Sequence, residues 1–211
     1  MKAVFFYDVP LIYGQDGQVY GTIFGYNMWK RYLASFDFLV VSTRARFDTS
    51  TDSSMTKDRK LSSGPKVEFK PISKYETSKD LIFCRKEISF QIRQILDQCD
   101  LAIIRLPSFV GKIACKEAEK INKPYLIEVV GCAMDSLLYH GSIAGKILAP
   151  YNFITTRNAI KRSKYVIYVT SEFLQERYPT NGISTNCSDV IIHSLKSETL
   201  DRKSTRLNSS H

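Results

Sequence analysis

The stretch LAIIRLPSFVGKIACKEAEKINKPYLIEVV, residues 101–130, decides the fold. Two short apolar runs, Leu101–Leu106 and 125–130, flank a segment in which Val110, Ala114 and Ala118 recur at helical spacing. Continuous apolar runs are typical of strands buried on both faces, and a helix usually makes the crossover between two parallel strands. This stretch therefore predicts a strand–helix–strand unit of a parallel sheet.

The same alternation continues in both directions along the chain. Apolar runs predict further strands at residues 2–7 (stopped by Pro10), 38–42, 67–72, 165–170 and, more weakly, 190–193. Helical spacing predicts helices over residues 23–33, 88–96, 107–118, from beyond 130 to about 161, and 171–178. This order indicates an α/β fold, a Rossmann-like doubly wound domain whose mainly parallel sheet is covered on both faces.

Two segments stand outside this pattern. Residues 48–65 are rich in Ser, Thr, Asp and Lys and predict a mobile loop. Residues 201–211, DRKSTRLNSSH, can be back-translated into the sequence of a widely used short-read sequencing adapter. We therefore expect these last residues to be non-native, and residues 1–200 to form one domain of a truncated chain.

The charge of the chain favours anionic partners. The formal net charge is +9, and the last eleven residues hold only three of the 30 basic and one of the 21 acidic side chains. Nucleotide diphosphates, nucleic acid and an acidic membrane surface all fit such a balance. Basic residues are not interleaved with aromatic ones in a known nucleic-acid-binding motif, so we expect no nucleic-acid partner.

The cysteines, the apolar runs and the absence of several motifs limit the classes of protein that the sequence fits. The five cysteines are scattered and odd in number, which is typical of reduced thiols in a cytosolic protein. We find no signal peptide and no apolar run of roughly 20 residues, and expect a soluble cytoplasmic protein. His140 and His193 have no companion at metal-ligand spacing, and HExxH, GxSxG and P-loop motifs are missing. We therefore predict no metal site and no cofactor.

Candidate site residues follow the predicted strands, because ligands of open α/β sheets bind beyond the carboxyl ends of the strands. Gly14 and Gly17 follow the first strand, where glycines allow backbone N–H groups to approach a ligand or simply make a turn. Their spacing is not that of the GxGxxG fingerprint. Arg105 ends the strand at 101–106, where a guanidinium suits a phosphate or a sugar hydroxyl, or a structural salt bridge.

The next predicted strand contributes three more candidates. Glu128 lies inside an apolar run, where a carboxylate is costly unless it is paired, so it is either a partnered core residue or a site residue. Gly131 and Asp135 follow at the mouth of the sheet. Asp135 is suited to accept hydrogen bonds from a hydroxylated substrate, or to cap a helix. We therefore place Arg105, Glu128, Gly131 and Asp135 at the cleft side of the domain.

Two stretches resemble a known family. IIRLPSFVGKIACKEAEKINKPYLIEVVGCAMDSL (103–137) resembles the middle of the N-terminal domain of bacterial GT-B glycosyltransferases, and YVIYVTSEFLQERYPTNG (165–182) resembles its late segment. The likeness is greatest to glycosyltransferase family 4, especially members of capsule and exopolysaccharide clusters. It spans most of residues 1–195.

The resemblance implies a retaining hexosyltransferase that moves a sugar from a nucleotide sugar to a hydroxyl of a growing, often lipid-linked, glycan, without a bound metal. It also implies two Rossmann-like domains, of which this acceptor-side one is present and the donor-binding one absent, so that the fragment alone is inactive. The loop of Gly14 and Gly17 matches the family's loop that faces the donor phosphates. Many members carry a histidine where Val130-Gly131-Cys132 stands here, so no catalytic residue is assigned.

Other interpretations stay open at this point. The chain also fits a non-catalytic, one-domain sugar- or nucleotide-binding module. An epimerase or dehydrogenase on the same sheet is disfavoured by the lack of GxGxxG. The segment from Lys146 to Lys164 mixes apolar and basic residues. It is suited to peripheral contact with an anionic membrane at the inner face of the cell, or to ordinary packing as a helix with a solvated end.

Overall fold

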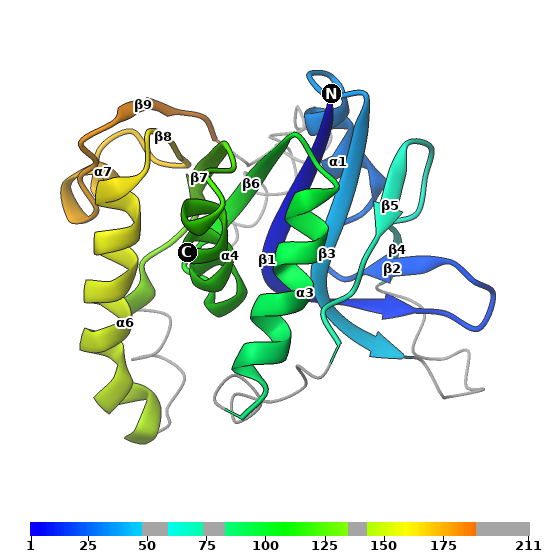
Figure 1. Cartoon of the computed structure of the whole chain (residues 1–211), viewed down its shortest axis with the longest axis horizontal. Coiled ribbons are helices and arrows are strands. Elements are labelled where there is room, and N and C mark those ends of the chain that lie inside the picture. The colour runs from blue at the N-terminus through cyan, green and yellow to red at the C-terminus, as the bar shows by residue number, and fades with distance from the viewer. Residues whose placement is uncertain (48–58, 74–82, 135–142, 189–211) are drawn as a thin grey trace, which may run out of the picture.

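The computed structural model describes residues 1–47, 59–73, 83–134 and 143–188, and there nine strands join one sheet (Figure 1). The strands are β1 (Lys2–Tyr13), β2 (Val19–Gly21), β3 (Phe38–Phe47), β4 (Lys60–Leu61), β5 (Val67–Phe69), β6 (Leu101–Leu106), β7 (Tyr125–Val129), β8 (Tyr165–Tyr168) and β9 (Ile183–Asn186). The helices are α1 (Tyr26–Leu33), α3 (Arg85–Asp97), α4 (Phe109–Lys120), α6 (Ile143–Arg162) and α7 (Phe173–Arg177).

The sheet is mainly parallel, which confirms the predicted fold class. Parallel pairing links the strands in the order β5-β3-β1-β6-β7-β8-β9, while β2 runs antiparallel to β1 and β4 antiparallel to β2. The chain builds outward from β1 through β3 to β5 and then returns to place β6 on the other side of β1. The strand order therefore reverses between β1 and β6, which makes this the switch point of the sheet.

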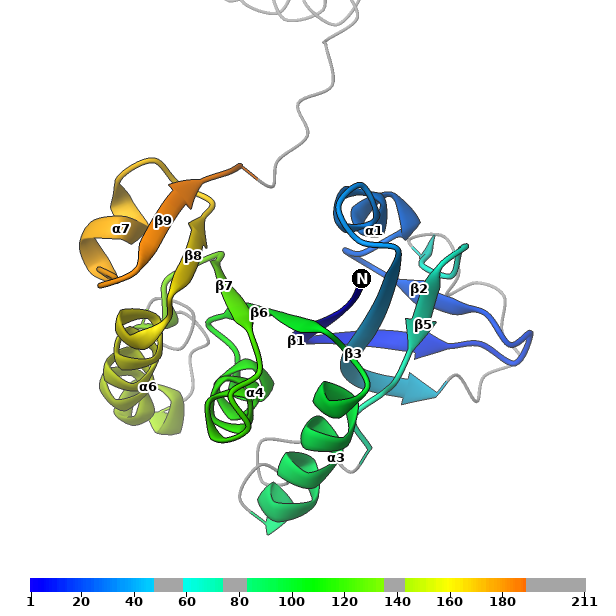
Figure 2. The ribbon, with the colours of Figure 1, turned by 45° about the horizontal axis from the view of Figure 1, so that its top comes forward.

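Helices cover both faces of the sheet. Figure 2 shows α3, α4 and α6 in a row on one face and α1 on the other. Successive residues of β6 point to opposite faces, so Ile104 joins the core under α3, α4 and α6 while Ile103 joins the core under α1. Burial on both faces explains why the central strands read as continuous apolar runs.

One prediction about the first strand is wrong, because β1 continues through Pro10 to Tyr13. The register of β1 against β3 shifts between Phe6 and Pro10, and pairing with β6 has already ended at Phe6. A residue without an N–H at position 10 therefore removes no β1–β6 hydrogen bond, and the strand tolerates it.

The loop and the last strand predicted from the sequence lie partly outside the described residues. The end of the predicted loop at 48–65 contains the short strand β4, whereas residues 48–58 lie outside the described residues. The last strand is β9 at Ile183–Asn186, and the run predicted at 190–193 lies outside the described residues, as do residues 201–211. Thr170 Oγ1 accepts the backbone N–H of Leu174 in α7 at 3.0 Å.

Candidate functional site at the carboxyl edge of the sheet

An acidic side chain, that of Asp8, lies at the switch point between β1 and β6 and contacts the start of α4. Asp8 lies where pairing of β1 with β6 has ended, and its two carboxylate oxygens accept the backbone N–H groups of Phe109 at 2.6 Å and of Val110 at 2.9 Å. Ser108 Oγ accepts the N–H of Gly111 at 2.8 Å. The free N–H groups of a helix N-terminus usually attract a phosphate. At the start of α4 the protein's own carboxylate and hydroxyl take that place.

The environment of Asp8 affects its protonation. Burial raises the pKa of the Asp8 carboxyl, and the N–H groups of Val110 and Phe109 oppose that rise. Sequence reasoning missed Asp8, although an acidic residue directly after an apolar strand was the available signal. A carboxylate at the edge of an open sheet is suited to accept a hydrogen bond from a ligand hydroxyl.

Two predicted site residues, Arg105 and Glu128, form a buried ion pair. They are register partners on β6 and β7, and Arg105 Nε donates to Glu128 Oε2 at 2.8 Å. The two residues are only 4% and 7% exposed. The hydroxyl of Tyr32, from α1, donates to the same carboxylate oxygen at 2.8 Å. Burial, followed by the negative charge of Glu128, raises the pKa of Tyr32.

Aromatic rings enclose the guanidinium of Arg105. Its central carbon lies 5.4 Å from the ring centre of Phe24, 5.8 Å from that of Phe5 and 5.9 Å from that of Tyr7. Rings at this distance attract a cation through their faces. The structure thus brings Arg105 and Glu128 together under α1, and a ligand-binding role for either residue stays a prediction.

The two glycines after the first strand lie in a hairpin turn between β1 and β2. The N–H of Gly14 donates to the carbonyl of Gln18 at 2.9 Å, and the N–H of Gly17 donates to the carbonyl of Gly14 at 3.2 Å. Gly17 has φ +75°, a left-handed conformation that favours glycine. This geometry accounts for both glycines as turn residues, and contact with donor phosphates stays a prediction.

Gly131 borders open space at the carboxyl edge. It follows β7, and among the described residues a Cβ placed there would meet only Pro107 Cδ, at 3.9 Å. The described residues therefore offer little steric resistance to a ligand beside Gly131. Asp135, the last predicted candidate, lies outside the described residues, as does His140.

A lysine that sequence reasoning missed lies between α4 and α6. Lys112 Nζ donates to Asn152 Oδ1 and, at 3.3 Å, to Thr155 Oγ1, and it lies 4.6 Å from the ring centre of Phe109. Burial lowers the pKa of Lys112 to about 8, although the negative charge of Asp8 opposes this. No local sequence pattern distinguishes this lysine from the exposed Lys116, one turn further along the helix.

A wide depression of about 670 Å³ lies at the opposite edge of the sheet. Tyr125 and Tyr165, the first residues of β7 and β8, line it together with Glu119 and Arg162. It opens where strands begin, so it is separate from the carboxyl edge. Among the described residues no group of three His, Cys, Asp or Glu side chains is arranged to hold a metal ion. No helix in that part of the chain is long and apolar enough to cross a membrane.

The chain is similar to one curated protein over most of its length. It is 38% identical over 183 residues to Protein CapJ of Staphylococcus aureus, which covers 86% of this chain and 45% of CapJ. No family model matches the chain. The chain therefore spans less than half the length of this relative.

Two solved structures show distant similarity. UDP-GlcNAc 2-epimerase from Methanocaldococcus jannaschii has a TM-score of 0.43 and 13% identity, over 84% of this chain and 42% of the epimerase. Sucrose-phosphate synthase from Thermosynechococcus elongatus has a TM-score of 0.46 and 12% identity, over 89% of this chain and 48% of the synthase. At these scores neither similarity bears on function, and the fold rests on the strand order of the chain itself.

Proposed function

We propose that this chain is the acceptor-side domain of a GT-B-type glycosyltransferase of family 4. The observation that carries the proposal is the carboxyl edge at the switch point, where Asp8 fills the N-terminus of α4 and the described residues leave open space beside Gly131. A carboxylate in that position disfavours a phosphate by charge repulsion and favours hydroxyl groups. Such an edge is suited to a glycan acceptor.

The proposal also specifies the reaction, the role of a second domain and the location of the enzyme. The complete enzyme is a retaining hexosyltransferase that takes a sugar from a nucleotide sugar and attaches it to a hydroxyl of a growing, lipid-linked polysaccharide of the capsule type. A second Rossmann-like domain supplies most of the nucleotide-sugar contacts, so residues 1–200 alone are inactive. The enzyme acts in the cytoplasm at the inner face of the membrane, without a metal ion or nucleic-acid partner. The match to less than half of CapJ is compatible with a longer protein.

Two experiments test the proposal. Sequencing of the source DNA beyond codon 200, from an independent library, should reveal a further α/β domain of about 150–200 residues. The protein made from that extended gene should transfer radiolabelled sugar from a nucleotide sugar to a glycan acceptor, whereas the 211-residue chain should not. Transfer by the 211-residue chain alone would contradict the assignment of the donor site to a second domain.

The same experiments address the alternative of a one-domain binding module. If the gene encodes residues 201–211 and then a stop codon, the chain is complete as one domain. A saturable affinity of this chain for nucleotide sugars would then favour the binding module, because we assign those ligands to a second domain.

A further inference from the structure

The helix layer formed by α3, α4 and α6 carries most of the excess positive charge. These three helices lie in a row on one face of the sheet (Figure 2). α3 and α4 each carry three basic and two acidic side chains, whereas α6 carries four basic side chains and no acidic one. A net positive charge on one face attracts an anionic surface from a distance.

The outer side of α6 combines cations with exposed apolar side chains. Tyr151 is 63% exposed and Ile154 is 55% exposed, and the exposed Arg157 and Lys161 follow on the same side of the helix. The opposite side of α6 is buried against the domain. An apolar and basic stripe of this kind is typical of helices that lie in the interface of an anionic bilayer.

The junction between α3 and α4 extends the same surface. A shallow groove there is lined mainly by four basic side chains and one aromatic, namely Arg85, Lys86, Arg93, Lys120 and the 61% exposed Phe90. Glu117 is the one acidic side chain in this lining, and its carboxylate accepts a hydrogen bond from Lys120 at 2.6 Å and is almost fully buried. The groove therefore presents a net positive charge.

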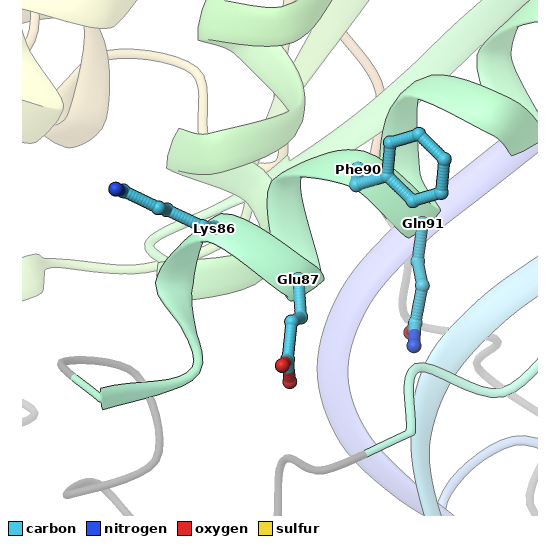
Figure 3. A pocket seen from close by; sticks show the side chains of 4 residues that line it. All are labelled: Lys86, Glu87, Phe90 and Gln91. Carbon is cyan, nitrogen blue, oxygen red and sulfur yellow. The ribbon is translucent and has the colours of Figure 1, made fainter.

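Glu87, the acidic residue in the first turn of α3, lines a neighbouring depression of about 380 Å³ together with Lys86, Phe90 and Gln91. Figure 3 shows Glu87 and Gln91 extending to the same side of α3, while Lys86 extends in a different direction. The amide of Gln91 contacts Ser73, so that side of α3 faces the segment after β5. Lys86 and Phe90 also line the groove toward α4, and Glu87 is not part of that lining.

We propose that the outer surface of α3, α4 and α6 binds the anionic lipid headgroups of a bilayer. The basic side chains contact lipid phosphates, and Phe90, Tyr151 and Ile154 enter the boundary between headgroups and acyl chains. The exposed apolar side chains select a bilayer over a soluble polyanion, because only a bilayer removes them from water. This inference rests on the proposed function, because lipid binding would bring the domain to a lipid-linked acceptor.

Vesicle binding tests the inference without any sugar transfer. The 211-residue chain should sediment with vesicles of equal parts phosphatidylglycerol and phosphatidylcholine, and not with pure phosphatidylcholine vesicles. Binding should weaken as salt is raised, because screening shortens the reach of the charges. Equal binding to both kinds of vesicle, or no binding to either, would overturn the inference.

Paired variants locate the surface. R157Q/K161Q should lower the partition coefficient on the order of 30-fold, because each basic residue near an anionic surface contributes about fivefold. The matched control K30Q/K60Q removes the same charge from exposed lysines beside α1, on the other face, and should change binding by less than about twofold. An equal loss in both variants would mean that net charge alone drives binding, and would reject this surface.

A third variant separates a bilayer from a soluble polyanion. Y151S/I154S keeps every charge and should weaken vesicle binding while leaving binding to poly-glutamate unchanged. If it leaves vesicle binding unchanged, and poly-glutamate binds as strongly as the vesicles, the surface serves a soluble polyanion and the lipid assignment is wrong. Either failure leaves the acceptor-side proposal standing, because that proposal rests on the carboxyl edge.

Discussion

Asp8 Oδ2 lies 2.6 Å from the backbone nitrogen of Phe109, 101 residues further along the chain. This contact joins the end of the β1–β6 pairing to the start of α4 and fills the helix N-terminus at the switch point. The negative charge there changes which ligands fit, since a bound phosphate would have to displace or protonate a carboxylate. Hydroxyl groups meet no such obstacle.

Removal of the Asp8 carboxylate should destabilise the domain. Asp8→Ala leaves the N–H groups of Phe109 and Val110 without their acceptor, and should lower the free energy of unfolding in urea by about 1–2 kcal/mol. The control Asp97→Ala changes an exposed residue at the end of α3 and should cost less than about 0.5 kcal/mol. Equal effects of the two changes would show that Asp8 does not cap α4.

The pH dependence of stability should reveal the titration of Asp8. Its folded-state pKa is raised, so the folded protein holds this proton more tightly than the unfolded chain does. The stability that it contributes is fully present below the unfolded pKa of about 3.9 and is lost as pH rises through the higher folded pKa. The D8N variant lacks this titration. Wild-type stability relative to D8N should therefore fall as pH rises above about 4, and a constant difference would contradict the raised pKa.

The buried ion pair should be costly to break from one side only. Arg105→Met leaves the Glu128 carboxylate buried without its guanidinium partner, and should lower the free energy of unfolding by about 3–5 kcal/mol. The double variant Arg105→Met with Glu128→Gln should recover part of that loss, because no uncompensated charge remains. Lys2→Met, in the more exposed pair with Glu68, should cost less than about 1 kcal/mol.

The lowered pKa of Lys112 predicts that the free energy of unfolding rises at alkaline pH. Its folded pKa of about 8 lies below the ordinary lysine value of about 10.4, so the folded protein releases this proton before the unfolded chain does. Between these two values the unfolded chain binds more protons, and stability increases with pH. Urea unfolding from pH 7 to 10 should show wild type gaining stability relative to Lys112→Met. If the free energy of unfolding of both proteins changed with pH in the same way, Lys112 would be solvated and its pKa would not be lowered by burial.

Two glycines beside the site should respond in opposite ways to an added methyl group. Gly131→Ala should be tolerated within about 1 kcal/mol, because in the described part of the chain its Cβ would meet only Pro107 Cδ. Gly111→Ala would place a Cβ 2.7 Å from the carbonyl oxygen of Arg105, and should cost about 1–3 kcal/mol or more. Thermal unfolding of both variants tests this contrast, and a similar loss in both would contradict the open space at Gly131.

The sequence predicted the fold better than it predicted the site. Continuous apolar runs such as 101–106 identify buried parallel strands, because burial on both faces leaves no alternation. β9 escaped prediction because its four residues, Ile183–Asn186, are all exposed and mostly polar. Backbone pairing with β8 holds this strand, and no side-chain pattern records such pairing.

The site depends on contacts between distant residues. Arg105 and Glu128 were predicted separately, and only the register of β6 against β7 pairs them. Tyr32 reaches Glu128 across 96 residues, and Asp8 reaches α4 across a similar distance. A local pattern of residues carries no information about such contacts, which explains why Tyr32 and Lys112 were missed. For Asp8 the position after an apolar run was a local signal, but its partners on α4 were not.

Amide NMR titration of the 211-residue chain tests the central claim most directly. Neutral oligosaccharides should shift the signals of Gly131 and Phe109 in a saturable way, whereas nucleotide sugars should leave them unchanged because Asp8 occupies the N-terminus of α4. Saturable shifts of Phe109 and Val110 by a nucleotide sugar, without a response to oligosaccharides, would show a phosphate site at the switch point. That result would contradict the acceptor-side assignment.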